Sequence, residues 1–234
     1  MIDVLVPSAI VLACYLALVH RARAWPALRS ACFAAGLLVV AVAVSVGDES
    51  LPLHMAAHGV LVAVAAPLLV LGRPVTLMLR ELPRPSAREL ARLLRAPWLR
   101  TALWPPLAWT AFVAIQLAFH VTPLFRLSLE DETLHAVEHL LFLLSALWLW
   151  TVCLAVEPLP RRWPAIARAG LLLAAMMASD AGSVRLMLDG EPAAGAAMVV
   201  SMSPMGLGGV GLFWVAMLRE ERRQRRREVA HAAG

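Results

Sequence analysis

Residues 51–72 read LPLHMAAHGVLVAVAAPLLVLG, a stretch without a single Asp, Glu, Lys or Arg. A helix that crosses a bilayer needs about 20 predominantly apolar residues, so this stretch is long enough to span a membrane. Its two histidines, His54 and His58, lie one helical turn apart and therefore share a helix face. The stretch predicts a membrane helix that carries a pair of imidazoles.

Similar charge-free stretches recur along the whole chain. Of its 234 residues, 61% are hydrophobic and only 16% are charged, whereas soluble domains carry about a quarter charged residues. This composition excludes a disordered chain, a nucleic-acid-binding arm and an ordinary soluble enzyme. We predict an all-α polytopic membrane helix bundle with seven transmembrane helices in a single integral membrane domain, residues 1–234. The predicted spans are residues 4–20, 30–47, 52–72, 101–121, 133–156, 164–184 and 193–218.

The basic residues orient these spans. All 21 are arginines, and all but Arg126 and Arg185 fall on one side of the predicted bundle, which the positive-inside rule makes cytoplasmic. We therefore expect the N-terminus outside, the C-terminus inside, and a basic cytoplasmic tail over residues 219–234. The first span has no basic residue before it and no small-residue cleavage pattern, so we expect a retained helix. The opposite side carries acidic residues: Asp3, Asp48, Glu49, Glu130, Asp131, Glu132, Asp189 and Glu191.

Residues 80–97 form a sizeable cytoplasmic loop in this arrangement. Ser86 followed by Glu89 fits a capping box, which marks the start of a helix. Such a helix is amphipathic, with arginines on one face and leucines on the other (Arg88, Arg92 and Arg95; Leu90, Leu93 and Leu94). We predict an interfacial helix that is held by anionic lipid of the inner leaflet. A docking site for a partner protein is the alternative.

Several residues predict how the spans bend and pack. Pro67 lies inside the third span and should kink it. Trp148 and Trp150 lie near the inner end of the fifth span, where indole rings prefer the membrane interface. The last span carries small residues that permit close helix packing: Gly206, Gly208, Gly209 and Gly211.

Five of the seven histidines fall at one predicted depth, just inside the outer surface. They open the third span, close the fourth and open the fifth, and two pairs have i,i+4 spacing. Polar groups inside membranes face the bundle interior, and imidazole binds copper, zinc, iron and nickel. Hydrogen bonding between helices is the alternative for a single histidine, but it explains two pairs and a fifth residue poorly. We predict a metal site whose ligands are His54, His58, His120, His135 and His139.

Four methionines provide additional candidate ligands. Thioether sulfur is a soft ligand that selects Cu(I), whereas a methionine stripe at helical spacing is also typical of plain packing. The stripe lies in the outer half of the last span, and one further methionine separates the first histidine pair: Met198, Met202 and Met205, and Met55.

Two carboxylates lie close to the predicted site in sequence. Glu138 stands between His135 and His139, where it can fix a histidine tautomer from behind or remain a solvated residue at the start of the helix. Asp180 is the acidic residue within the sixth span. It either marks the outer boundary of that span or reaches the histidines.

Five stretches of this sequence resemble the CtaG-type cytochrome c oxidase assembly factors. They are HMAAH at 54–58, APLLVLGRP at 66–74, HVTPLF at 120–125, LHAVEH at 134–139 and WLW at 148–150. These factors are integral membrane proteins linked to copper insertion into haem–copper oxidases. The resemblance implies a multi-pass protein of the bacterial plasma (inner) membrane that holds Cu(I) at the outer face. Its implied partners are an oxidase subunit, a periplasmic copper donor and membrane lipid, with no nucleic acid and no enzymatic activity.

The chain departs from that family in the last span. The family pattern has an Asp-Gln pair before a Gly-Gly, whereas residues 203–209 read SPMGLGG here. Met202 and Met205 lie where the polar pair would be. Either thioethers replace those polar groups or this region serves another purpose.

Two other functions fit part of the pattern. A zinc-dependent seven-helix membrane hydrolase, similar to the ceramidases, would use three histidines to bind zinc and lower the pKa of a bound water. Glu138 or Asp180 would then act as the base, but the methionine stripe argues against this class. A bis-histidine haem protein is the third hypothesis, and five histidines crowded near one surface fit it poorly.

Overall fold

The computed structural model describes residues 2–46, 50–160 and 162–232 of the chain. These residues fold into helices and contain no β-strand in the described ranges. The predicted outer acids Asp48 and Glu49, and Arg161 of a predicted inner loop, lie outside the described residues. The helices in chain order are α1 (Ile2–Arg21), α2 (Ala27–Val46), α3 (Leu51–Val60), the π-helix η1 (Leu61–Ala65), α4 (Ala66–Leu71), α5 (Pro74–Glu81), α6 (Arg84–Leu94), α7 (Pro97–Ala102), α8 (Pro105–Val121), α9 (Leu124–Glu130), α10 (Glu132–Leu154), α11 (Ala165–Leu188) and α12 (Pro192–Ala232).

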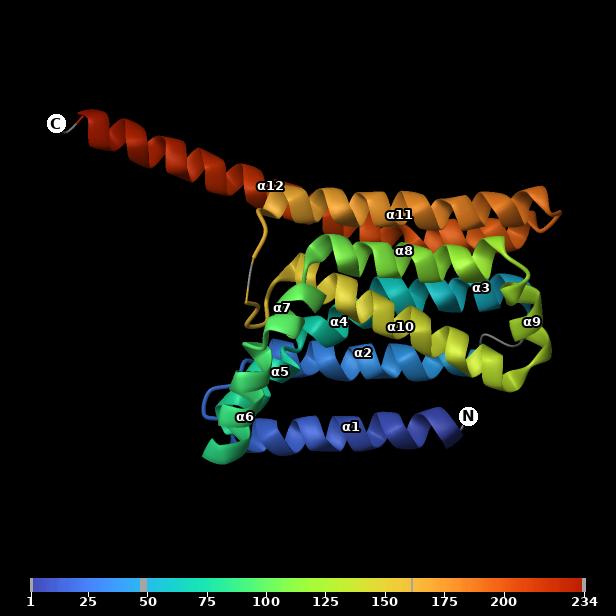
Figure 1. Ribbon diagram of the computed structural model, residues 1–234, viewed down its shortest axis with the longest axis horizontal. Helices are drawn as coiled ribbons and strands as arrows, with labels where there is room; N and C mark the ends of the chain where they lie inside the picture. The colour runs from blue at the N-terminus through green and yellow to red at the C-terminus, as the bar shows by residue number, and fades with distance from the viewer. Residues whose placement is uncertain (1, 47–49, 161, 233–234) are drawn as a thin grey trace.

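The long helices run lengthwise in one bundle, and short helices cover its two ends (Figure 1). The N-terminus, α9 and the turn between α11 and α12 lie at one end, which we call the histidine end. Helices α5, α6 and α7 lie at the other end, which we call the arginine end, and the last part of α12 projects beyond it. This up-and-down order matches the predicted loops. The orientation of the two ends relative to the membrane remains a prediction.

Five helical segments of the described residues are long and apolar enough to cross a membrane. Helices α8 and α9 pass the same test only as a pair that is bent by 71°, which allows a sixth span. The described apolar part of α1, Leu5–Arg21, is shorter. Five or six spans therefore satisfy length and composition, where the sequence predicts seven. A helix such as α8, with 17 residues, reaches only about 26 Å, less than the roughly 30 Å of a hydrocarbon core.

The helix that carries His54 and His58 is interrupted in its middle by η1. The sequence predicts a kink at Pro67, and the structure has a π-turn just before that proline. The Ala66 amide donates to the carbonyl of Leu61 rather than that of Val62, and Pro67 has no N–H to offer. The Val62 carbonyl instead accepts a hydrogen bond of 2.8 Å from the Trp150 indole.

The sequence predicts an interfacial position for Trp150, but the structure shows a core residue that is only 2% exposed. A buried carbonyl without a partner costs free energy, so this indole stabilises the π-turn. Trp148 donates to the Ala102 carbonyl at 2.9 Å and so links α10 to the end of α7.

The predicted loop helix is also reorganised. Residues 80–97 contain α6 with a break on each side instead of one continuous helix. The predicted capping box is wrong, because α6 begins at Arg84 with Pro83 at its N-cap. Ser86 is consequently inside the helix, and Glu89 pairs with Arg92 at 3.5 Å.

Small residues let the helices at the histidine end approach closely. An added Cβ on Gly59 of α3 would lie 1.9 Å from the Ser201 hydroxyl of α12. A Cβ on Gly182 of α11 would lie 2.7 Å from the His120 Cβ of α8. These contacts bring α8, α11, α12 and α3 together around the candidate site.

Candidate metal centre

Three helices carry the five predicted histidine ligands to the histidine end. His54 and His58 lie in α3, His120 lies in the last turn of α8, and His135 and His139 open α10. All are buried except His135, which is partly exposed. The i,i+4 spacing places the two histidines of each pair on one helix face. The short helix α9 connects the end of α8 to the start of α10, so that His120 lies at the same end of the bundle as His135 and His139.

His54, His58 and His139 form the tightest group. One ligand nitrogen from each lies within 4.8 Å of the others. The ring centroids are 4.2 Å apart for His54 and His58, 4.8 Å for His58 and His139, and 5.5 Å for His54 and His139. An ion about 2 Å from each nitrogen would separate its ligand atoms by about 3 to 4 Å. Small side-chain rotations would therefore bring this triad into coordination.

The remaining two histidines flank the triad on opposite sides. The His135 ring lies 4.9 Å from His54 and 4.5 Å from His139. The His120 ring lies 5.9 Å from His58. The structure thus brings together all five predicted histidines, with three close enough to share one ion.

Backbone carbonyls orient two of these rings. The His120 Nδ1 lies 2.8 Å from the Gln116 carbonyl, and the His139 Nδ1 lies 3.2 Å from the His135 carbonyl. A carbonyl accepts only, so Nδ1 must carry the proton in both contacts, and Nε2 is left as the ligand atom. Such a hydrogen bond fixes the tautomer in many metal sites.

Glu138 lies behind His58 and is completely buried. Its Oε1 is 3.9 Å from the His58 Nε2, and neither carboxylate oxygen has a hydrogen bond among the described residues. The alternative of a solvated residue at the helix start is therefore wrong. A buried carboxylate is costly without a compensating charge or donor, and a cation on the neighbouring imidazoles would supply that charge.

Two aromatic rings that the sequence does not predict as part of the site also lie against the histidines. Phe142 is fully buried, stacks on His120 at 5.2 Å and meets the edge of His58 at 4.7 Å. Phe125 of α9 lies 6.1 Å from His54. Phe142 follows His139 by three residues in the same helix, so helical spacing could have predicted that the two side chains share a face. The position of Phe125 depends on the bend between α8 and α9.

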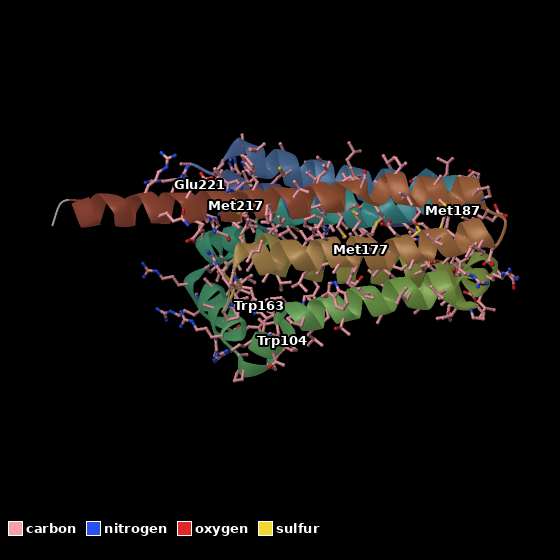
Figure 2. The ribbon with its side chains drawn as sticks, turned by 90° about the horizontal axis from the view of Figure 1, so that it is seen from above. Trp104, Trp163, Met177, Met187, Met217 and Glu221 are labelled. Carbon is pink, nitrogen blue, oxygen red and sulfur yellow. The ribbon has the colours of Figure 1, made fainter. Side chains whose placement is uncertain are left out.

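The four candidate methionines are all buried in the main core (Met55, Met198, Met202 and Met205). Met198 lies near the cluster, because its methyl group and the His120 side chain both approach Gly182. Burial in the core agrees with the packing alternative for Met202 and Met205. In contrast, Met177 is 70% exposed on the surface of α11, near the middle of the helix. Met187 is 38% exposed and lies at the histidine end (Figure 2).

Asp180 does not join the cluster within the part of the chain that the structure describes. It is half-buried in α11, which continues beyond it to Leu188. Its neighbour Ser179 is the residue that faces inward, where it accepts a hydrogen bond of 3.4 Å from Gln116.

An all-helical membrane bundle with a buried imidazole cluster at one end is the class that this fold and site define. The chain belongs to the cytochrome c oxidase caa3 assembly factor family (Caa3_CtaG), whose sequence pattern matches residues 12–216. This match confirms the resemblance drawn from the histidine motifs.

The curated relatives of the chain are mycobacterial. Uncharacterized proteins of Mycobacterium bovis and Mycobacterium tuberculosis are each 32% identical to it over 174 residues, 69% of this chain and 26% of theirs. An uncharacterized protein of Mycobacterium leprae is 34% identical over 137 residues, 56% of this chain and 21% of its own. The chain thus spans about a quarter of the length of these relatives. No solved structure matches it.

Proposed function

We propose that this protein holds Cu(I) at the histidine end and passes it to a haem–copper cytochrome c oxidase during assembly. The observation that carries the proposal is the triad of His54, His58 and His139, whose ligand nitrogens lie within 4.8 Å of one another. The family description supplies the context of oxidase assembly. An assembly factor that transfers an ion performs no chemistry on a substrate, so the proposal does not make this protein an enzyme.

Copper is favoured over other metals by the surroundings of the triad. A Cu(I) ion accepts two or three imidazoles and thioethers, which are soft or borderline ligands. The Met198 methyl group and the His120 side chain both lie near Gly182, and the His120 ring is 5.9 Å from that of His58, so a thioether lies near this edge of the histidine cluster. Glu138 would neutralise the positive charge of the bound ion from behind His58.

A transfer site must release its ion as well as bind it. His135 is the partly exposed member of the cluster and lies next to both His54 and His139. We assign it to the exchange of copper with the outside, and the buried triad to storage. A periplasmic donor would load the site and an oxidase subunit would receive the ion, with the protein in the bacterial plasma membrane and its histidine end outward.

The proposal is tested by metal analysis of the purified full-length chain. After anaerobic loading with Cu(I) and removal of loose metal, stoichiometric copper is expected in the unaltered protein. The His58→Ala variant should lose most of it. The His20→Ala variant is the matched control, because His20 lies exposed at the far end of α1.

Two results would overturn the copper proposal. Tightly bound zinc that resists competition by Cu(I) would favour the membrane hydrolase, with Glu138 as the base. A Soret absorption band in the purified protein would favour the haem protein. Equal copper in both histidine variants would instead show that the triad is not the site.

A further inference from the structure

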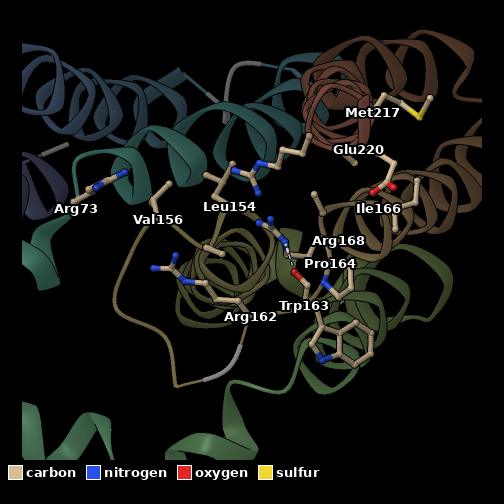
Figure 3. Close-up of a pocket in the computed structure, with 14 residues that line it drawn as sticks. Arg73, Leu154, Val156, Arg162, Trp163, Pro164, Ile166, Arg168, Met217 and Glu220 are labelled. Carbon is tan, nitrogen blue, oxygen red and sulfur yellow. Dashed lines mark hydrogen bonds between the residues drawn. The ribbon is translucent and has the colours of Figure 1, made fainter. Parts of the chain in front are cut away.

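The arginine end contains a pocket that the metal site does not use. It encloses about 680 Å³ between the end of α10, the α10–α11 connection, the start of α11 and the middle of α12. Figure 3 shows Arg162 and Arg168 beside it, with Trp163 and Glu220 at other positions around the opening. Its lining includes four arginines but, among the described lining residues, one acid: Arg73, Arg162, Arg168 and Arg219, and Glu220.

Arg168 is the buried charge of this pocket. Only 7% of the residue is exposed, and its guanidinium donates to the Trp163 carbonyl at 3.0 Å and to the Cys153 carbonyl. No carboxylate within the described part of the chain lies within ion-pair distance of it. Carbonyl oxygens satisfy donors but do not neutralise a charge, and a buried uncompensated charge is expensive.

The nearby groups add positive charge instead of cancelling it. Arg162 and Arg219 lie close enough to Arg168 for like-charge repulsion. Glu157 is near in sequence, but its carboxylate is used elsewhere, since it accepts hydrogen bonds from the Val75 and Thr76 amides at the start of α5. The pocket is therefore preorganised for an anion.

Part of the pocket wall is apolar and exposed. Ile166 of α11 and Met217 of α12 line it and are 51% and 47% exposed, as expected for side chains that meet lipid tails. Trp163 and Pro164 complete this side of the wall. A soluble anion gains nothing from such a wall, whereas a phospholipid has both a phosphate and apolar chains to fill it.

We propose that this arginine pocket binds the phosphate group of an anionic membrane lipid, with its glycerol and acyl chains along Ile166 and Met217. Basic pockets between membrane helices are known to hold anionic headgroups. The site is distinct from the metal centre, which lies at the opposite end of the bundle (Figure 1). Lipid bound there would join α10, α11 and α12 where they leave the membrane.

The test measures lipid retained by the purified full-length protein. The delipidated protein is titrated in detergent with phosphatidylglycerol, and separately with phosphatidylcholine, and bound lipid is counted by native mass spectrometry. Saturable binding of phosphatidylglycerol in preference to phosphatidylcholine is expected. The double variant Arg162→Gln with Arg219→Gln should weaken this binding about tenfold or more.

Two further variants make the test specific. Arg21→Gln with Arg23→Gln removes the same charge from exposed positions at and just after the end of α1, which do not line the pocket, and should leave the saturable binding unchanged. Arg162→Lys with Arg219→Lys keeps the charge and should retain most of the binding, which separates loss of the site from loss of the fold.

Three outcomes would overturn the proposal. Equal weakening by both glutamine pairs would mean that diffuse surface charge attracts the lipid. Displacement of phosphatidylglycerol by inorganic phosphate, or binding of phosphate alone with the same dependence on Arg162 and Arg219, would mean a site for a soluble anion. Equal binding of both lipids would mean that the phosphate is bound without selection by charge.

Discussion

The pairing of Glu138 with His58 is the clearest chemical feature at the scale of single residues. A carboxylate with no exposed surface and a distance of 3.9 Å to an imidazole nitrogen would not persist in a membrane bundle without a reason, because its desolvation is costly. A cation held by the imidazoles, as proposed, would compensate this cost. The same carboxylate would also polarise His58 and strengthen it as a ligand.

Glu138→Gln should therefore weaken copper binding without preventing folding. The amide keeps the volume but removes the charge, and loss of such an outer partner lowers metal affinity by about 10- to 100-fold. Competition with a chromogenic Cu(I) chelator measures the change. Glu132→Gln is the control, because Glu132 is exposed at the start of the same helix. An unchanged Cu(I) affinity in Glu138→Gln would contradict the assigned electrostatic contribution.

The sequence predicts the convergence of the five histidines, but it does not predict the burial of Glu138. Arginine placement set the depth of each span end, and helical spacing set the shared face of each pair, so the convergence of the histidines followed from local rules. Whether Glu138 faces water or the core depends on where α3 and α9 pack against α10, which no local pattern records. Phe125 was missed for the same reason.

Close packing at glycines dominates at the scale of helices. Gly182 allows α11 to touch α8 directly at His120, and an added Cβ would lie 2.7 Å from the histidine side chain. The two helices must separate to admit even one methyl group. Any such separation would change the position of His120 relative to His58, whose ring lies 5.9 Å away.

Gly182→Ala should destabilise the protein by about 1 to 3 kcal/mol, the usual cost of overpacking. Gly170→Ala lies in the same helix with nothing within 4 Å of its added Cβ, and it should be neutral or stabilising by up to about 1 kcal/mol. Thermal unfolding in detergent compares the two variants. Matching shifts in both would contradict the close contact at His120.

The π-turn η1 supplies a second prediction for this scale. Trp150→Phe removes the donor to the Val62 carbonyl and should cost about 1 to 3 kcal/mol, because a buried acceptor loses its partner. Trp98→Phe is the control, since Trp98 is 60% exposed. Unfolding temperatures measured in the same detergent decide between them. A loss no larger than that of the control would argue against the hydrogen bond.

The partner of the π-turn could not be read from the sequence. Pro67 predicted a distortion of the third span, but the indole that donates to the Val62 carbonyl in the π-turn belongs to Trp150, 88 residues beyond Val62. Trp150 also looks interfacial by its position near the end of a span. Helix α9 was missed because it is a seven-residue segment, too short for a periodic pattern.

The bundle as a whole has two chemically different ends. Histidines and aromatic rings gather at one, and arginines gather at the other around α5, α6 and α7. The alternation of apolar segments with arginine-rich loops was sufficient to predict this polarity. The seven predicted spans are not confirmed, because five segments of the described residues, or six with the bent α8–α9 pair, meet the test of length and composition. Helix α12 continues without a break into the predicted basic tail.

Cysteine labelling tests the predicted orientation. In a background with Cys14, Cys32 and Cys153 replaced by alanine, Glu130→Cys should react with a membrane-impermeant maleimide on intact spheroplasts. Arg88→Cys should react only after the membrane is opened. Both positions are exposed. The reverse pattern of labelling would place the metal centre on the cytoplasmic side.

The π-turn also makes this protein sensitive to residue number as well as residue type. An α-helix rotates about 100° per residue, and η1 accommodates one residue more than a regular turn would hold. Because the wide turn takes up its extra residue locally, deleting one residue between Leu61 and Ala65 should restore a regular turn and leave His54 and His58 close to their present phase relative to α4. Inserting one more residue would leave the apolar composition almost unchanged, but it would turn His54 and His58 by about 100° relative to α4, and the two imidazoles would no longer face His139. A single insertion in this short segment is thus expected to break up the histidine cluster while leaving a membrane helix of normal hydrophobicity.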